Sequence, residues 1–150
     1  MGMTIGLLNV RRSILVQAPP ERVWQEFESF DRFSAWFGLG HELHRFELKL
    51  GAEVDLSVAI DGERRHFGGS VVVVEREREV SFESNWHPPN DWPVPTFFTL
   101  RLMPVYEGTM VEIFHHGFER FGANAADILQ GYEEGWDVKH LKALRAIIEQ

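Results

Sequence analysis

Apolar and polar residues alternate along most of the chain, which is the pattern of strands that bury one face. This alternation predicts strands over residues 10–17, 43–49, 53–60, 64–75, 80–86, 96–103 and 109–117. Asp61-Gly62 separates two of these strands and is typical of a tight hairpin turn, because glycine accepts a positive φ. Consecutive strands joined by such short connections predict an antiparallel sheet.

Three segments show the helical period instead. The first, 21–27, follows Pro19-Pro20, and a second, 31–36, has Ser29 or Asp31 as its capping residue. The last, 124–150, carries one apolar stripe: Ile128, Leu129, Tyr132, Trp136, His140, Leu144 and Ile147. At 1.5 Å per residue it would be about 40 Å long, enough to cross the sheet. The elements predict an α+β fold in a single domain, 1–150.

The composition narrows the classes of partner. The 150 residues carry a formal charge of −8 and no cysteine, which excludes disulfides, thiolate metal sites and cysteine nucleophiles. The basic residues are scattered, so neither nucleic acid nor an anionic membrane surface is an expected partner. The N-terminal residues lack the order of a signal peptide and are too short for a membrane span, so we expect a cytoplasmic protein.

Four segments together resemble a known superfamily. They are APPERVW at 18–24, the helix Phe33–Trp36, the strand 109–118 ending in HHGF, and Gly135-Trp136. With the order of elements along the chain, they make it similar to the START-like superfamily with the helix-grip (Bet v 1-like) fold. Within it the likeness is greatest to the group related to the activator of Hsp90 ATPase.

The resemblance implies a curved antiparallel sheet wrapped around a long C-terminal helix, with two short helices after the first strand. It also implies a hydrophobic cavity between the sheet and that helix. Members bind lipids, hormones, polyketides or a chaperone, and only some catalyse a reaction. The sequence departs from many relatives at Trp36-Phe37-Gly38-Leu39-Gly40 and at the single Gly51, both expected near the cavity mouth.

We therefore expect the protein to bind a small hydrophobic molecule in this cavity. The aromatic content of 13% suits an apolar wall. The residues expected to line it are Trp36, Phe82, Trp86, Phe98, His115, Trp136 and His140. No cofactor is expected, because the chain has no P-loop and no dinucleotide fingerprint.

Two of these residues have structural as well as functional interpretations. His115 shares a strand face with Val111 and Ile113, so it should point inward, either to orient a ligand or to bond to the backbone. Trp136 would either stack on a flat ligand or pack the last helix on the sheet, and large aromatics at helical spacing are usually core.

The spacing of the histidines does not predict a metal centre. His41 and His44 lack the helical i, i+4 pairing that places two imidazoles on one face. His66, His115 and His140 would suit zinc only if the fold brought them together, which their linear spacing does not require.

Two other functions stay open beside ligand binding. In one, an inward histidine serves a polyketide cyclase, dehydratase or hydrolase as acid and base, with an apparent pKa of roughly 6–7. In the other, the protein is a co-chaperone whose surface binds Hsp90. Either a monomer or a homodimer fits the sequence.

Overall fold

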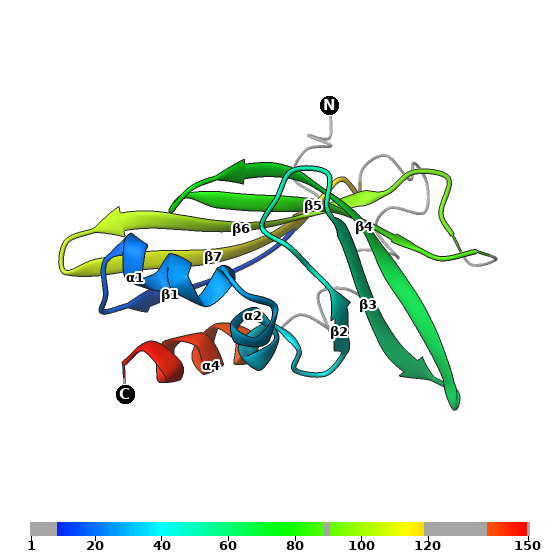
Figure 1. Cartoon of the computed structure of the whole chain (residues 1–150), viewed down its shortest axis with the longest axis horizontal. Coiled ribbons are helices and arrows are strands. Elements are labelled where there is room, and N and C mark those ends of the chain that lie inside the picture. The colour runs from blue at the N-terminus through cyan, green and yellow to red at the C-terminus, as the bar shows by residue number, and fades with distance from the viewer. Residues whose placement is uncertain (1–8, 89–90, 119–137, 150) are drawn as a thin grey trace, which may run out of the picture.

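The computed structural model describes residues 9–88, 91–118 and 138–149. Within them, seven antiparallel strands form one curved sheet in the order β1-β7-β6-β5-β4-β3-β2 (Figure 1). The strands are β1 (Val10–Val16), β2 (Glu42–Arg45), β3 (Glu53–Ile60), β4 (Glu63–Glu75), β5 (Glu79–Trp86), β6 (Thr96–Val105) and β7 (Gly108–His116). This confirms the predicted α+β class and the antiparallel sheet.

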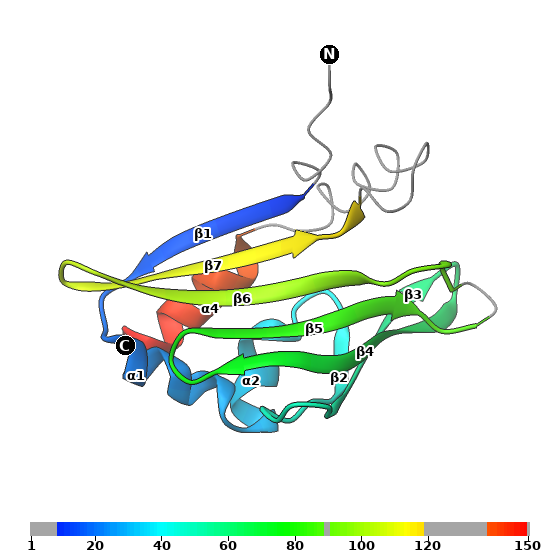
Figure 2. The same ribbon diagram turned by 90° about the horizontal axis from the view of Figure 1, so that it is seen from above.

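The helices lie together against one face of the sheet, as Figures 1 and 2 show. They are α1 (Pro20–Trp24), the 3-10 helix η2 (Gln25–Phe27), α2 (Phe30–Phe37) and α4 (Lys139–Ile148). Pro20 begins α1, where its missing N–H costs nothing. Of the two candidate caps for α2, Ser29 is the one used, since its Oγ accepts a hydrogen bond from the Arg32 N–H at 3.1 Å.

The predicted strand 43–49 is too long, because β2 ends at Arg45. The next residue, Phe46, is 5% exposed, and its ring stacks on that of Phe33 with centroids 4.2 Å apart. The chain then returns to the sheet at Gly51, whose N–H bonds to the carbonyl of Val71. Burial of the Phe46 ring thus stabilises the structure more than a longer β2 at the edge of the sheet would.

The predicted C-terminal helix 124–150 is described only in part. Its residues 124–137, with Trp136, lie outside the described residues, and α4 begins at Lys139, so one long helix is not confirmed. Leu141 and Leu144 of α4 are fully buried, and the Glu149 carboxylate accepts the backbone N–H of Gln17 at 2.7 Å. No helix in the described part of the chain is long and apolar enough to cross a bilayer.

An aromatic cluster fills the space between the first helices and the sheet. The Phe33 ring lies 5.1 Å from that of Trp36 and 4.7 Å from that of Phe37. Phe27 packs on the same group, and the Trp36 indole N–H donates to the carbonyl of Glu26 at 3.2 Å. Aromatic pairs of this kind add about 0.5–1.5 kcal/mol each beyond burial of their area.

A buried carboxylate fixes α2 relative to α1. Glu26 is 4% exposed, and one of its oxygens lies 2.6 Å from the Arg22 guanidinium and 3.1 Å from that of Arg32. An unpaired carboxylate at this depth would be strongly destabilising, so the two arginines permit its burial.

Gly68 lies where the backbone of β3 leaves no room for a side chain on β4. The sequence places Gly68-Gly69 inside a strand, where we expect a bulge or a bend. Gly68 has φ +143°, and a Cβ there would lie 2.0 Å from the Val54 carbonyl oxygen. The register shift between β4 and β5 falls further along, between Val71 and Val73.

Replacing Gly68 by alanine should lower the free energy of unfolding by more than about 2 kcal/mol, because the methyl group collides with backbone. Gly62→Ala is the matched control. Gly62 also has a positive φ, +80°, but nothing lies within 4 Å of its Cβ position, so strain alone should cost about 1 kcal/mol. Urea denaturation measures the free energy of unfolding of both variants. Equal decreases would contradict the close approach of the Val54 carbonyl at Gly68.

Candidate functional site

The described residues enclose a small cavity between the inner face of the sheet and the end of α2. Its volume is about 10 Å³. It is lined by Phe37, Leu56, Phe67, Phe82, Ser84, Phe98 and His115. A space of this size holds about one water molecule. Most of its wall is aromatic, and its polar groups are gathered on β5 and β7.

His115 is the polar centre of this wall. It points inward from β7 as its alternation with Ile113 predicts, and it is 1% exposed. Its Nε2 lies 2.7 Å from the Thr96 hydroxyl, which donates its own proton to the Ser84 carbonyl at 3.0 Å. The hydroxyl therefore accepts from His115, which places the imidazole proton on Nε2.

Burial keeps His115 neutral. Its pKa is lowered from 6.5 to about 3, chiefly by desolvation and secondarily by the neighbouring His116. The ring also packs against Phe98 and Phe118, with centroids 5.7 and 4.8 Å away. His115 therefore presents a neutral, oriented imidazole to an apolar space.

Two further histidines, His41 and His140, pack against Phe37. His41 and His140 stack with ring centroids 5.5 Å apart, and His140 Nε2–H donates to the Leu39 carbonyl at 2.7 Å. The pKa of His41 is lowered to about 4, first by burial and then by the nearby His140 and Lys139. His140 is thus buried at the α2–α4 contact and does not line the cavity.

The structure brings three of the seven predicted lining residues together, namely Phe82, Phe98 and His115. Trp36 lies in the aromatic cluster under α2, because its indole N–H faces Glu26. Trp86 packs on Phe67 at 5.0 Å and, with Trp92, lines a separate surface hollow of about 250 Å³. Trp136 lies outside the described residues. Ligand binding by these side chains stays a prediction.

Sequence reasoning missed four lining residues, Phe37, Leu56, Phe67 and Ser84. Strand alternation offered a signal for Ser84, which shares a face with Phe82, and for Leu56 within its apolar strand. Phe37 ends a short helix, so only the packing of α2 on the sheet decides where its ring points.

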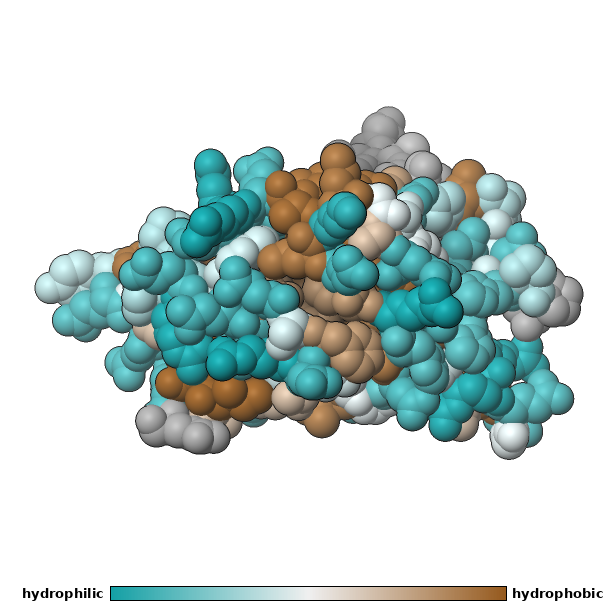
Figure 3. All heavy atoms as spheres, viewed as in Figure 1, coloured by the Kyte–Doolittle hydropathy of each residue, from teal (hydrophilic) through white to brown (hydrophobic). Residues whose placement is uncertain are grey.

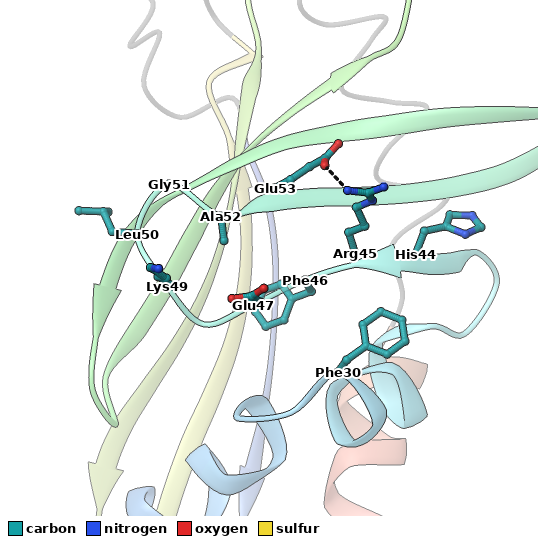
Figure 4. Close-up of a pocket in the computed structure, with 10 residues that line it drawn as sticks. All are labelled: Phe30, His44, Arg45, Phe46, Glu47, Lys49, Leu50, Gly51, Ala52 and Glu53. Carbon is teal, nitrogen blue, oxygen red and sulfur yellow. Dashed lines mark hydrogen bonds and ion pairs between the residues drawn. The ribbon is translucent and has the colours of Figure 1, made fainter.

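A larger hollow opens on the surface between Phe30 and the loop before β3 (Figure 4). Its volume is about 800 Å³, and its wall includes the ion pair of Arg45 with Glu53 at 3.1 Å. Apolar side chains gather on the face of the molecule shown in Figure 3, and Leu50 of the loop, labelled in Figure 4, is 65% exposed. Because its wall is open and partly charged, it suits an enclosed apolar ligand less well than the inner cavity does.

The three histidines considered together as zinc ligands do not converge. His115 faces the inner cavity and His140 faces Leu39, whereas His66 Nδ1 bonds to Asp55 at 3.0 Å on the opposite side of the sheet. There Asp55, His66 and His87 form a group of potential metal ligands.

Known structures share this fold over nearly the whole chain. A Mycobacterium smegmatis protein has a TM-score of 0.73 at 16% identity, covering 99% of this chain and 95% of its own. A protein from Arthrobacter aurescens has a TM-score of 0.72 at 18% identity, covering 99% and 90%. The AHSA1 protein from Silicibacter pomeroyi has 0.70 at 19% identity, covering 94% and 97%. These identities establish the fold alone. No curated protein matches the sequence.

The sequence itself establishes the family. The family model described as Activator of Hsp90 ATPase homolog 1-like protein matches residues 17–149. This match runs from the end of β1 to the residue after α4 and includes all the residues that line the inner cavity. The chain therefore belongs to the family of activator of Hsp90 ATPase homolog 1-like proteins, within the START-like superfamily of helix-grip folds.

Proposed function

We propose that this protein binds a small apolar molecule between the sheet and the helices, with the polar end of that molecule at His115. The observation that carries the proposal is a fully buried histidine, held in one tautomer by Thr96, in the wall of an otherwise aromatic cavity. Membership of a family with a ligand-binding fold supports it.

The polar groups favour a ligand with one hydroxyl or carbonyl. Thr96 and His115 are 0% and 1% exposed, so neither exchanges hydrogen bonds freely with water. Because the Nε2–H of His115 already donates to Thr96, a ligand oxygen that accepts this proton would replace the Thr96 hydroxyl, and the new bond would be one that water does not weaken. The aromatic side chains would supply affinity by burial, at about 25 cal/mol per Å² before the costs of association.

The ligand must enlarge the cavity to enter it. A volume of about 10 Å³ admits only one small group, so ring side chains have to move. Phe67 is the half-buried ring among them and lies between His41 and Trp86, at 6.1 and 5.0 Å. We propose that displacement of Phe67 opens the site.

Acid–base catalysis by the inward histidines fits less well. A general base works best when its pKa is near the operating pH. His115 and His41 have pKa values of about 3 and about 4, far below the value of 6–7 that the enzyme interpretation requires. Binding is therefore the better-supported function for this cavity.

A co-chaperone role is the second candidate, because the family description names activation of the Hsp90 ATPase. In that case the outer surface would contact Hsp90, and stimulation of Hsp90 ATP turnover would not change when the inner cavity is filled. A cytoplasmic location and the choice between monomer and homodimer stay predictions.

Filling the cavity should abolish ligand uptake. Ser84→Leu adds an apolar side chain to the cavity wall, so it should weaken binding of the aromatic, anionic dye 1-anilinonaphthalene-8-sulfonate at least ~10-fold, at a stability cost of about 1–3 kcal/mol. Ser13→Leu is the control, since it makes the same change at an exposed position of β1 outside the cavity wall and should leave dye affinity unaltered. Fluorescence titration measures both, with near-ultraviolet circular dichroism to verify folding.

The dye experiment also separates the alternatives. Failure of the unmodified protein to bind the dye would overturn the proposal. Equal affinities for the unmodified protein and both variants would place the dye outside the inner cavity, for example in the surface hollow of Figure 4, and contradict the inner site.

The neutral state of His115 predicts a pH-dependent stability. Its folded pKa of about 3 lies below 6.5, so between these values the unfolded state binds the proton. The contribution of neutral His115 to the free energy of unfolding is complete above about pH 6.5. It is lost as the pH falls towards 3, at up to about 1.4 kcal/mol per pH unit. Urea denaturation from pH 7 to 4 should show a shallower loss for His115→Gln than for the unmodified protein. Identical slopes would contradict burial of this imidazole.

A further inference from the structure

We propose that Asp55, His66 and His87 form a binding site for one divalent transition-metal ion, with Zn²⁺ as the best fit. The site lies on the face of the sheet opposite the inner cavity. Leu56 and Phe67 line that cavity, so their strand neighbours Asp55 and His66 point the other way. The proposal is independent of what the cavity binds.

The ligand atoms are already near the spacing that a metal requires. Asp55 Oδ1 lies 3.0 Å from His66 Nδ1 and 3.9 Å from His87 Nε2, and one potential ligand atom from each of the three residues lies within 4.8 Å of the other two. Nitrogen and oxygen ligands about 2.0–2.1 Å from a tetrahedral zinc ion are about 3.3 Å apart. Movements of the ligand atoms by about an ångström would therefore bring them to the spacing of a zinc site.

Backbone pairing holds these side chains in register. Asp55 pairs with Gly68 across the β3–β4 ladder, and His66 pairs with Ser57. His87 follows the last residue of β5, and its N–H donates to the His66 carbonyl at 3.0 Å. Two ligands thus lie on paired strands and the third directly follows the next strand, so the pairing of β3, β4 and β5 positions all three.

The chemistry of the three groups favours zinc over magnesium or calcium. Two imidazoles and one carboxylate are the ligand types of three-ligand zinc sites, in which water takes the fourth position. Without metal, the Nδ1–H of His66 donates to the Asp55 carboxylate. In the proposed site the ion would lie between Nδ1 and this carboxylate, and the proton of the neutral imidazole would be on Nε2. The side chains of His66 and His87 are 37% and 49% exposed, which leaves solvent access for that fourth position.

Charges near the site are mixed. The Asp55 side chain is only 14% exposed and supplies the negative charge, while Arg64 reaches Ser57 on the same face at 3.5 Å. His44 stands beside the site with its ring 5.0 Å from that of His66, but its Nε2 lies 2.6 Å from Ser57 Oγ and 3.3 Å from Glu42. We assign His44 to the surroundings of the site and not to its ligands.

The test is a zinc titration of the tag-free, chelator-treated full chain by isothermal calorimetry, with bound metal counted by mass spectrometry. One equivalent of Zn²⁺ should bind. His66→Gln and His87→Gln should each weaken binding at least ~10-fold, since loss of even an outer-shell partner of a metal ligand costs that much. His44→Gln should change affinity less than about threefold. Added zinc should raise the melting temperature of the unmodified protein and not that of the two ligand variants.

Three results would overturn the site. They are no binding at one equivalent, a stoichiometry well above one, or equal weakening by His44→Gln and His66→Gln. The last would indicate a diffuse patch of imidazoles. Substitution of Co²⁺ supplies a second readout, because its absorption spectrum distinguishes a four-coordinate site of mixed nitrogen and oxygen ligands from a hydrated ion. The hydrated spectrum would also contradict the proposal.

Discussion

In the described part of the chain, short helices cover the apolar inner face of the sheet, and Phe37 makes the contact on which this cover depends. It ends α2 and is 1% exposed. Its ring lies 4.7 Å from Phe33 in the helical cluster and 5.3 Å from Phe98 on the sheet. On its other side it packs against His41 at 5.4 Å. The position of the inner cavity and the burial of the histidines around it both follow from this packing.

Strand alternation divides the histidines into two chemical groups. His115, on the inner face, loses water and stays neutral in an apolar wall. His66, on the outer face, is 37% exposed beside the carboxylate of Asp55. The inner face thus suits orientation of an uncharged ligand, while the outer face suits a cation. The two candidate sites lie on opposite faces of one sheet, because the register of each strand determines the face to which each side chain points.

The sequence was sufficient for most of the sheet and for the part of the site that depends on period two, although the strand predicted over 43–49 ends at Arg45. Alternation correctly directed Phe98 and His115 inward, and turn residues located the hairpins. The sequence was insufficient wherever the packing of one element on another decides where a side chain points. Trp36 has the period of a buried helical residue, yet whether its ring meets the cavity or the helical cluster depends on how α2 lies on the sheet. The grouping of Asp55 with His87 depends on the registers of two successive strand pairings, β3 with β4 and β4 with β5, which alternation alone does not fix.

Native mass spectrometry of the freshly purified, tag-free protein, beside its denatured mass, tests most directly whether the interior holds a ligand. We predict an additional organic mass, reproducible between preparations, that is lost on denaturation and is absent from Ser84→Leu. A bare chain under every gentle condition, including after incubation with an apolar cell extract, would contradict binding in the cavity around His115.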